Sequence, residues 1–238
     1  MKLHTLLLSA GLLSLTGAAQ AALHDRGGGM IYDDVLDITW LQDANYAKTS
    51  GYDYDGLMAW SDAVTWASQL VYGGFTDWRL PETKPVGGTT YNFTMRFDGT
   101  SDKGYNITSQ ASEMAYMYYV NLSNMSRYDA NVVETGCATS GGNSCLENLG
   151  PFVNLKGTAS GDNVTAYWSG TDDVSNSGYA WNFFTGAGGQ FSSDKTFLKY
   201  AWAVRDGDVS APVPEPETYA LMLAGLGLVG WVARRRAA

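Results

Sequence analysis

The stretch Phe75-Thr76-Asp77-Trp78-Arg79-Leu80-Pro81 is the most informative part of this chain about its fold. It is rich in aromatic residues, follows an amphipathic segment and ends at a proline. Upstream, apolar side chains recur at the three- and four-residue spacing of one helical face. They are Trp60, Ala63, Val64, Ala67, Leu70 and Val71. Gly73 and Gly74 match the glycine-rich end of a helix, so the sequence predicts a helix that runs from Trp60 to these glycines.

Two short strands are predicted upstream of this helix. Met30–Tyr32 and Ile38–Leu41 are rich in apolar, β-branched and aromatic residues, and acidic residues bound them. Asp33-Asp34 supplies the polar residues expected of a turn between the two strands. A polar loop over Asn45–Gly56 then leads to the helix.

Downstream of Pro81 the chain enters a long excursion, Thr83–Gly104, that is rich in glycine and threonine. A second helix is predicted after it, with Ser109 or Ser112 as the N-cap. The apolar face of this helix is formed by Met114, Ala115, Tyr118 and Leu122. Asn124–Gly150 is irregular in composition.

The last third of the chain is predicted to be strands. Three aromatic-rich segments of strand length are Ala166–Gly170, Tyr179–Phe184 and Lys199–Arg205. Gly186–Gly189 forms a turn after the second segment. In the third, Tyr200, Trp202 and Val204 alternate with small or charged neighbours, which predicts one half-buried strand.

These segments occur in an order that resembles the Lcl C-terminal domain family, a domain of unknown function. The matching blocks are Ile38–Tyr46, Trp60–Ala63, Gly74–Pro81, Tyr167–Thr171 and Ala201–Gly207. The resemblance covers about Arg26–Asp208, and residues 22–208 are assigned to this domain. It implies an α+β fold, a single C-type-lectin-like domain with paired terminal strands, two helices, a long loop region and small antiparallel sheets.

The N-terminus has the three parts of a signal peptide. Lys2 is the positive residue, Leu6–Leu15 is a short apolar run, and Ala19-Gln20-Ala21 fits the small-x-small rule of signal peptidase. The run is too short to span about 30 Å of hydrocarbon comfortably. Residues 1–21 are therefore predicted to be removed after Ala21.

The C-terminus carries a second targeting pattern. A linker over residues 209–217 contains Pro214-Glu215-Pro216, and an apolar run fills much of the tail over residues 218–238, which carries Arg234, Arg235 and Arg236. This order resembles the PEP-CTERM sorting signal of Gram-negative bacteria. The resemblance implies transient anchoring in the inner membrane by a transmembrane helix, recognition by an exosortase, and display at the cell surface or in the extracellular matrix. A plain tail anchor is the alternative.

Composition limits the possible partners. The chain has 15 Lys and Arg against 24 Asp and Glu, with a formal net charge of −9. An acidic chain without a basic stripe is a poor binder of nucleic acid. The two cysteines, Cys137 and Cys145, are predicted to form a disulfide in an oxidising periplasm.

Histidine content argues against several kinds of catalysis. The chain has two histidines, His4 in the signal peptide and His24 near the mature N-terminus. A Ser-His-Asp triad and a His-rich zinc site are therefore not expected, and no catalytic residue is assigned. Carboxylates remain, since a polysaccharide hydrolase needs only two. No pair stands out among Asp33, Asp34, Asp53, Asp55, Asp172 and Asp173.

Calcium is the metal that the lectin resemblance raises. Trp181-Asn182-Phe183 lies where such lectins carry a Trp-Asn-Asp strand, but Phe183 replaces the third ligand. If calcium binds, Asp172, Asp173 and Asn182 are the predicted ligands, and Trp181 joins them as a ligand-binding residue. The acidic stretch Tyr52–Asp55 is a weaker alternative.

The remaining aromatic and basic residues are assigned structural roles. Trp78, Trp168, Trp181 and Trp202 favour a core position over a sugar-stacking platform. Arg79 and Arg205 are predicted to make cation–π contacts or to pair with buried acids. The sequence thus favours an exported, non-enzymatic module that binds extracellular polysaccharide. A carboxylate-dependent hydrolase and a purely structural envelope protein are the alternatives.

Overall fold

The computed structural model describes residues 23–137, 144–158 and 165–209. The predicted signal peptide, the sorting motif and the predicted membrane tail lie outside the described residues. Within the described ranges, none of the helices is both long enough and apolar enough to span a membrane.

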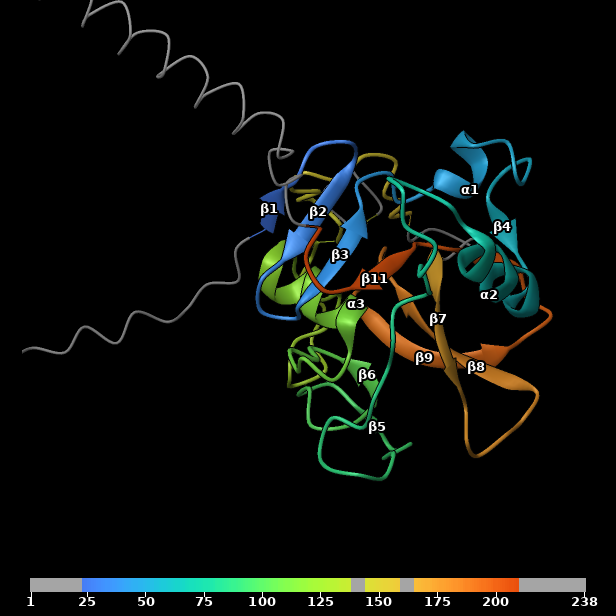
Figure 1. Ribbon diagram of the computed structural model, residues 1–238. Coiled ribbons are helices and arrows are strands. Elements are labelled where there is room, and N and C mark those ends of the chain that lie inside the picture. The colour runs from blue at the N-terminus through green and yellow to red at the C-terminus, as the bar shows by residue number, and fades with distance from the viewer. Residues whose placement is uncertain (1–22, 138–143, 159–164, 210–238) are drawn as a thin grey trace, which may run out of the picture.

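Two sheets and a few short helices form an α+β fold (Figure 1). The smaller sheet is ordered β1 (Leu23–Asp25), β2 (Met30–Asp33), β3 (Ile38–Leu41) and β11 (Val204–Asp206). The larger sheet is ordered β4 (Leu57–Met58), β10 (Lys199–Tyr200), β7 (Ala166–Asp172), β8 (Tyr179–Phe184), β9 (Gly189–Asp194), β6 (Lys103–Tyr105) and β5 (Met95–Arg96). The helices are α1 (Tyr46–Thr49), α2 (Trp60–Gln69), α3 (Glu113–Tyr116) and the π-helix η1 (Met117–Asn121).

The predicted strands near both ends are confirmed in part. β2 and β3 pair antiparallel as a hairpin, and β11 from the end of the domain pairs with β3. The larger sheet is not purely antiparallel, however, because β10 pairs with β7 and β5 pairs with β6 in parallel. The expectation of small antiparallel sheets is therefore wrong for the larger sheet.

The predicted strand Lys199–Arg205 is wrong as a single element. Its first residues form β10 in the larger sheet, and its last residues belong to β11 in the smaller one. Ala201, Trp202 and Ala203 connect the two strands, and all three are buried. They are buried on both sides because this connection passes between the two sheets. The alternation of large and small residues in the sequence predicts a half-buried strand and does not indicate such a connection.

The first helix ends earlier than predicted. α2 ends at Gln69, and Leu70 is already extended. Gly73 and Gly74 have positive φ angles and instead form a tight turn between Tyr72 and Phe75. The second helix begins as predicted, because Ser112 Oγ accepts a hydrogen bond from the Ala115 N–H.

Tryptophans form the centre of the core, as predicted. Trp78, Trp168, Trp181 and Trp202 are each at most 3% exposed. The Trp202 ring centroid lies 4.5 Å from that of Trp40 and 4.7 Å from that of Phe152. Its indole N–H also donates to the Leu41 carbonyl at 2.7 Å, which holds the β10–β11 connection against β3.

Arg79 joins segments that are far apart in the chain. All five of its N–H groups have acceptors: two atoms of the Glu113 carboxylate, the Leu80 carbonyl, and Asp206 Oδ1, which accepts from two of them. Burial lowers the pKa of the guanidinium, but hydrogen bonds with Glu113 and Asp206 outweigh burial and raise it above its usual value. The predicted pairing of Arg79 with a buried acid is confirmed, since Glu113 is 8% exposed.

Arg205 of β11 makes a second ionic connection, to the segment just before Arg79. Its guanidinium donates to both oxygens of Asp77 at 3.0 and 2.9 Å and lies 4.2 Å above the Phe75 ring. These hydrogen bonds lower the pKa of the Asp77 carboxyl. The predicted cation–π contact is therefore present, whereas the acid that pairs with Arg205 is exposed and not buried as predicted.

We predict that Glu113→Gln destabilises the domain by about 2–4 kcal/mol. The substitution removes the buried counter-ion of Arg79 and leaves only the exposed carboxylate of Asp206, and breaking one side of a buried pair is expensive. Urea unfolding measures the difference. The matched control is Glu134→Gln, which removes the acid of the exposed Arg127–Glu134 pair. It should lower the free energy of unfolding by less than about 1 kcal/mol. Equal effects of the two variants would contradict the role given to Arg79.

Candidate functional site

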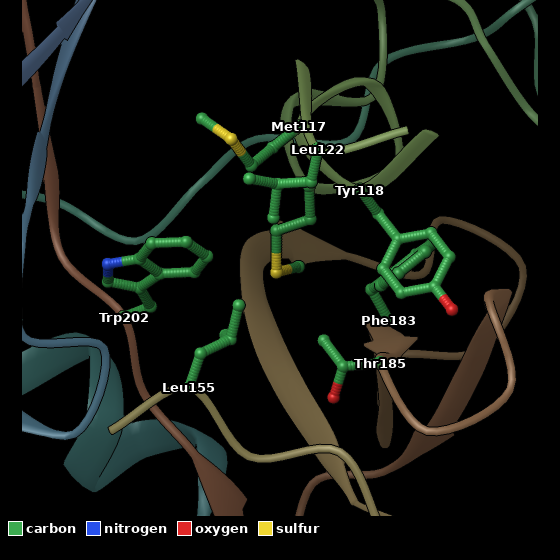
Figure 2. Close-up of a pocket in the computed structure, with 8 residues that line it drawn as sticks. Met117, Tyr118, Leu122, Leu155, Phe183, Thr185 and Trp202 are labelled. Carbon is green, nitrogen blue, oxygen red and sulfur yellow. The ribbon is translucent and has the colours of Figure 1, made fainter. Parts of the chain in front are cut away.

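One small cavity in the described part of the domain is a packing void. It measures about 10 Å³ and is lined by Met114, Met117, Tyr118, Leu122, Leu155, Phe183, Thr185 and Trp202 (Figure 2). Both hydroxyls among these residues are engaged elsewhere: Thr185 donates to the Lys156 carbonyl at 2.6 Å, and Tyr118 donates to the Met125 and Cys145 carbonyls. A water needs about this volume and two to four polar partners, so the void offers no ligand site.

A larger surface hollow of about 250 Å³ lies between α2 and the segment Trp78–Glu82. Arg79 lines it, but every N–H of this guanidinium is already engaged. Glu82, on its rim, pairs with Lys84 at 2.6 Å. The hollow therefore has room for a small ligand but no free charged donor to hold one.

The three predicted calcium ligands have separate surroundings. Asp172 pairs with Lys195, and Asp173 Oδ1 accepts from the backbone and hydroxyl of Ser175. Asn182 is 1% exposed; its Nδ2 donates to Ser193 Oγ at 3.0 Å, and among the described residues its Oδ1 has no hydrogen-bond partner. In the described part of the chain, no three Asp, Glu, His or Cys side chains are grouped so as to hold a metal ion. Calcium binding stays a prediction.

Trp181 offers no free ring face to a ligand. It is fully buried, and the rings of Tyr91 and Phe93 stack on it at 5.3 and 5.6 Å. Both covering rings come from the long excursion after Pro81, and both are partly exposed. Trp181 is thus the base of a closed aromatic stack.

The opposite face of the larger sheet carries a row of half-buried rings. We call Phe97, Tyr105, Tyr128, Phe184 and Phe191 the aromatic ribbon; all five are partly exposed. Phe97 stacks on Tyr105 at 5.3 Å, Tyr105 meets Phe191 edge-on at 5.7 Å, and Phe191 meets Phe184 at 5.1 Å. Tyr128 contacts Phe97 and Tyr105 at 5.6 and 5.3 Å. The ribbon therefore crosses β6, β9 and β8, which are neighbours in Figure 1.

The sheet register places these rings on one face. Tyr105 is opposite Gly189, which is opposite Phe184, and Phe191 follows two residues later. A Cβ at Gly189 would lie 2.4 Å from the Phe191 ring and 2.9 Å from the Tyr105 ring. Glycine at this position is what allows the rings to lie close over the strand. Phe183, one residue before Phe184, faces the other way and packs against Tyr118 of η1 at 5.2 Å.

Lys199 lies at the Phe184 end of the ribbon. Its Nζ is 5.2 Å from the Phe184 ring centroid, 5.1 Å from that of Trp168 and 5.8 Å from that of Phe197. The residue is 8% exposed. Burial lowers the pKa of the ammonium to about 8, because a charged amine loses hydration among aromatic rings.

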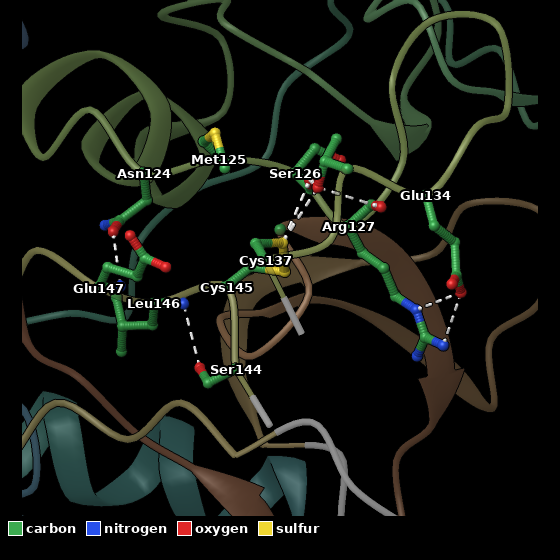
Figure 3. Close-up of a disulfide and its surroundings, with 12 residues drawn as sticks. Asn124, Met125, Ser126, Arg127, Glu134, Cys137, Ser144, Cys145, Leu146 and Glu147 are labelled. Carbon is green, nitrogen blue, oxygen red and sulfur yellow. Dashed lines mark hydrogen bonds and ion pairs between the residues drawn. A yellow bond between two sulfur atoms is a disulfide. The ribbon is translucent and has the colours of Figure 1, made fainter. Parts of the chain in front are cut away.

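The disulfide predicted for Cys137 and Cys145 is present, with a Cα–Cα distance of 4.8 Å. Figure 3 shows it beside Arg127, whose guanidinium pairs with Glu134 at 3.0 Å and lies 5.5 Å from the Tyr128 ring centroid. The Cys145 N–H donates to the carbonyl of Gly186 in the β8–β9 turn at 2.9 Å. The disulfide therefore supports the loop that carries Tyr128.

Comparison with known proteins identifies the C-terminal signal. The family model of the PEP-CTERM protein-sorting motif matches residues 212–236. The match includes Pro214-Glu215-Pro216 and Arg234–Arg236, so the predicted sorting motif is confirmed. No curated protein and no solved structure matches the chain.

The sequence offers Asp172, Asp173, Asn182 and Trp181 as candidate ligand residues and does not reveal the aromatic ribbon. The ribbon draws on five separate segments, and β9, which carries Phe191, has too little apolar alternation to be predicted. One usable signal was present. A hairpin that turns at Gly186–Gly189 brings Phe184 and Phe191 to the same part of one sheet.

We predict that Lys199→Met stabilises the domain at pH 7. A buried ammonium whose folded pKa is near 8, against about 10.4 unfolded, costs of the order of 2–3 kcal/mol while it is charged. Above about pH 8 the folded protein releases the Lys199 proton, whereas the unfolded chain keeps it to about pH 10. The destabilisation of the wild-type fold by the buried charge therefore disappears as pH rises from about 8 to 10.

Urea unfolding of both proteins between pH 7 and 9.5 measures this effect. The gain from Lys199→Met should shrink as pH rises. Lys195→Met, which removes an ammonium paired with Asp172, is the control and should give no gain. A pH-independent difference between wild type and Lys199→Met would contradict the prediction.

Proposed function

We propose that this protein is an exported, non-enzymatic module that binds extracellular saccharide along the aromatic ribbon. Its location is supported by the sorting motif at residues 212–236, which implies exosortase-dependent sorting to the cell exterior. In this proposal, signal peptidase and an exosortase process the chain. The processed protein works at the cell surface or in the exopolysaccharide matrix of a biofilm.

The observation that carries the proposal is the ribbon itself. Contiguous, partly exposed aromatic surface on a sheet costs hydration free energy unless a partner covers it. Aromatic rings combine large apolar area with low conformational freedom, which suits them to binding surfaces. Saccharides present C–H faces that pack on such rings. Arg127 at one end and Lys199 at the other add polar groups to the rim.

The resemblance to the Lcl C-terminal domain and the C-type lectin fold supports a binding role. The pairing of β11 with β3 brings the two ends of the domain into one sheet, and a long excursion with little regular structure lies between α2 and α3. Both features agree with what the resemblance implies. They support a lectin-like assignment as part of this proposal.

We predict that Phe191→Ala and Tyr105→Ala each weaken saccharide binding about tenfold. Central aromatic anchors commonly contribute this much or more to an interface, and Phe191 touches two other rings of the ribbon. Affinity electrophoresis of the exported protein in gels containing neutral or acidic polysaccharides measures retardation. Tyr54→Ala, at a 94% exposed ring outside the ribbon, is the control. Wild-type retardation of a variant that lacks both rings would refute the proposed surface.

We predict that the mature protein lacks Leu221–Ala238, because a sorting peptidase cuts near Pro214-Glu215-Pro216. The two prolines keep the backbone before the tail extended and open to a protease. Mass spectrometry of the C-terminal peptide from surface or medium protein tests this. A tail that still ends in Ala238, in a strain with a working exosortase, would indicate a simple anchor. Pro214→Ala combined with Pro216→Ala should retain the protein in the inner membrane.

A further inference from the structure

Lys199 lies at one end of the aromatic ribbon. Within the described residues its ammonium group has no counter-ion. Its three neighbours are the rings of Trp168, Phe184 and Phe197. Within the described residues, no hydrogen bond or ion pair reaches its Nζ. Cation–π attraction recovers part of the lost hydration, but a buried ammonium remains costly until an anion pairs with it.

The charged groups of the surrounding elements are engaged elsewhere. On the β9–β10 connection, Lys195 pairs with Asp172, and Asp194 accepts hydrogen bonds from Thr196. β7 and β8 face the amine with Trp168 and Phe184, and β4 places Met58 opposite Lys199. Burial is the sole cause of the lowered pKa of Lys199. Nζ thus has an unmet requirement for an anion.

One of the three rings around the amine is exposed to solvent. Trp168 is fully buried and Phe184 is half-buried, but Phe197 is 58% exposed. The exposed Phe197 ring lies on the connection between β9 and β10. A small anionic group can approach Nζ past this ring, whereas the opposite side is closed by the core.

We propose that Lys199 binds the carboxylate of an acidic saccharide that lies on the aromatic ribbon. This rests on the proposed saccharide-binding function and names the class of saccharide, one that contains uronic acid. The carboxylate of a uronic acid projects from the edge of the sugar ring. The C–H face of the sugar therefore contacts Phe184 while the carboxylate meets Nζ.

Proton linkage gives the proposal a signature that a structural lysine lacks. A bound carboxylate favours the ammonium form, so binding raises the pKa of Lys199. By reciprocity, affinity for the uronate falls as pH rises above about 8, where free Lys199 loses its proton. A surface lysine would keep its charge to about pH 10.

The test is NMR titration of Lys199 in the exported protein, labelled with ¹³C at lysine, with D-glucuronate and D-glucose as probes. Saturating glucuronate should raise the pKa of Lys199 by at least one unit, which corresponds to about tenfold tighter binding to the ammonium form. Glucose should leave the titration unchanged, because it carries an uncharged hydroxymethyl group where glucuronate carries the carboxylate. Lys199→Met should lose measurable glucuronate binding, and Lys195→Met should retain it.

A Lys199 titration that saturating glucuronate leaves unchanged would overturn this assignment, as would wild-type affinity in Lys199→Met. The ribbon has its own separate readout. If glucuronate shifts Lys199 but Phe191→Ala binds polysaccharide like wild type, the ribbon proposal fails and the anion site stands. If the ribbon variants lose binding while glucuronate has no effect on Lys199, the saccharide is bound without selection for its carboxylate.

Discussion

The fold depends on a single guanidinium whose hydrogen bonds are all used inside the protein. Arg79 ties the start of α3, through Glu113, to the end of β11, through Asp206. The backbone of Arg79 also pairs with Val204 in both directions at 2.8 Å. Two residues later, the Pro81 carbonyl accepts from Gly170 of β7. One short segment thereby joins both sheets and the second helix, and a lysine, with no planar fork of five donors, could not replace it.

The orientation of the larger sheet follows from this junction. With Arg79 and Val204 paired, Ala201–Ala203 must pass between the sheets, and Trp202 fills the space against Trp40 and Phe152. One face of β8 is then covered by η1 through Phe183 and Tyr118. Among the regular elements of the described chain, β9 packs mainly against its sheet neighbours β8 and β6. The face that carries the aromatic ribbon is consequently the one to which we assign the proposed saccharide.

Sequence patterns predict the parts of this fold that are set by local chemistry. The β2–β3 hairpin, β8 and the Ser112 cap are each encoded within a few residues, so they are predictable. The β10–β11 break is not, because burial on both sides depends on the distant packing of Trp40 and Phe152. The aromatic ribbon is not predictable for a similar reason. In the sequence each of its rings looks like an ordinary core residue, and only the order of the strands brings the rings together. The core position of Trp181 is predictable from the sequence, but the stacking of Tyr91 and Phe93 on it depends on a loop whose path the sequence does not specify.

The acidity of the chain and the isolated ammonium of Lys199 act at different ranges. A net charge of −9 repels polyanions at long range, but salt screens that repulsion within about 8 Å at physiological ionic strength. An ammonium recessed among three rings acts only on a group in direct contact, where the low dielectric strengthens its attraction. Such a site cannot steer an acidic polymer towards the protein. It can only distinguish, among saccharides already lying on the ribbon, those that place a carboxylate beside Phe184.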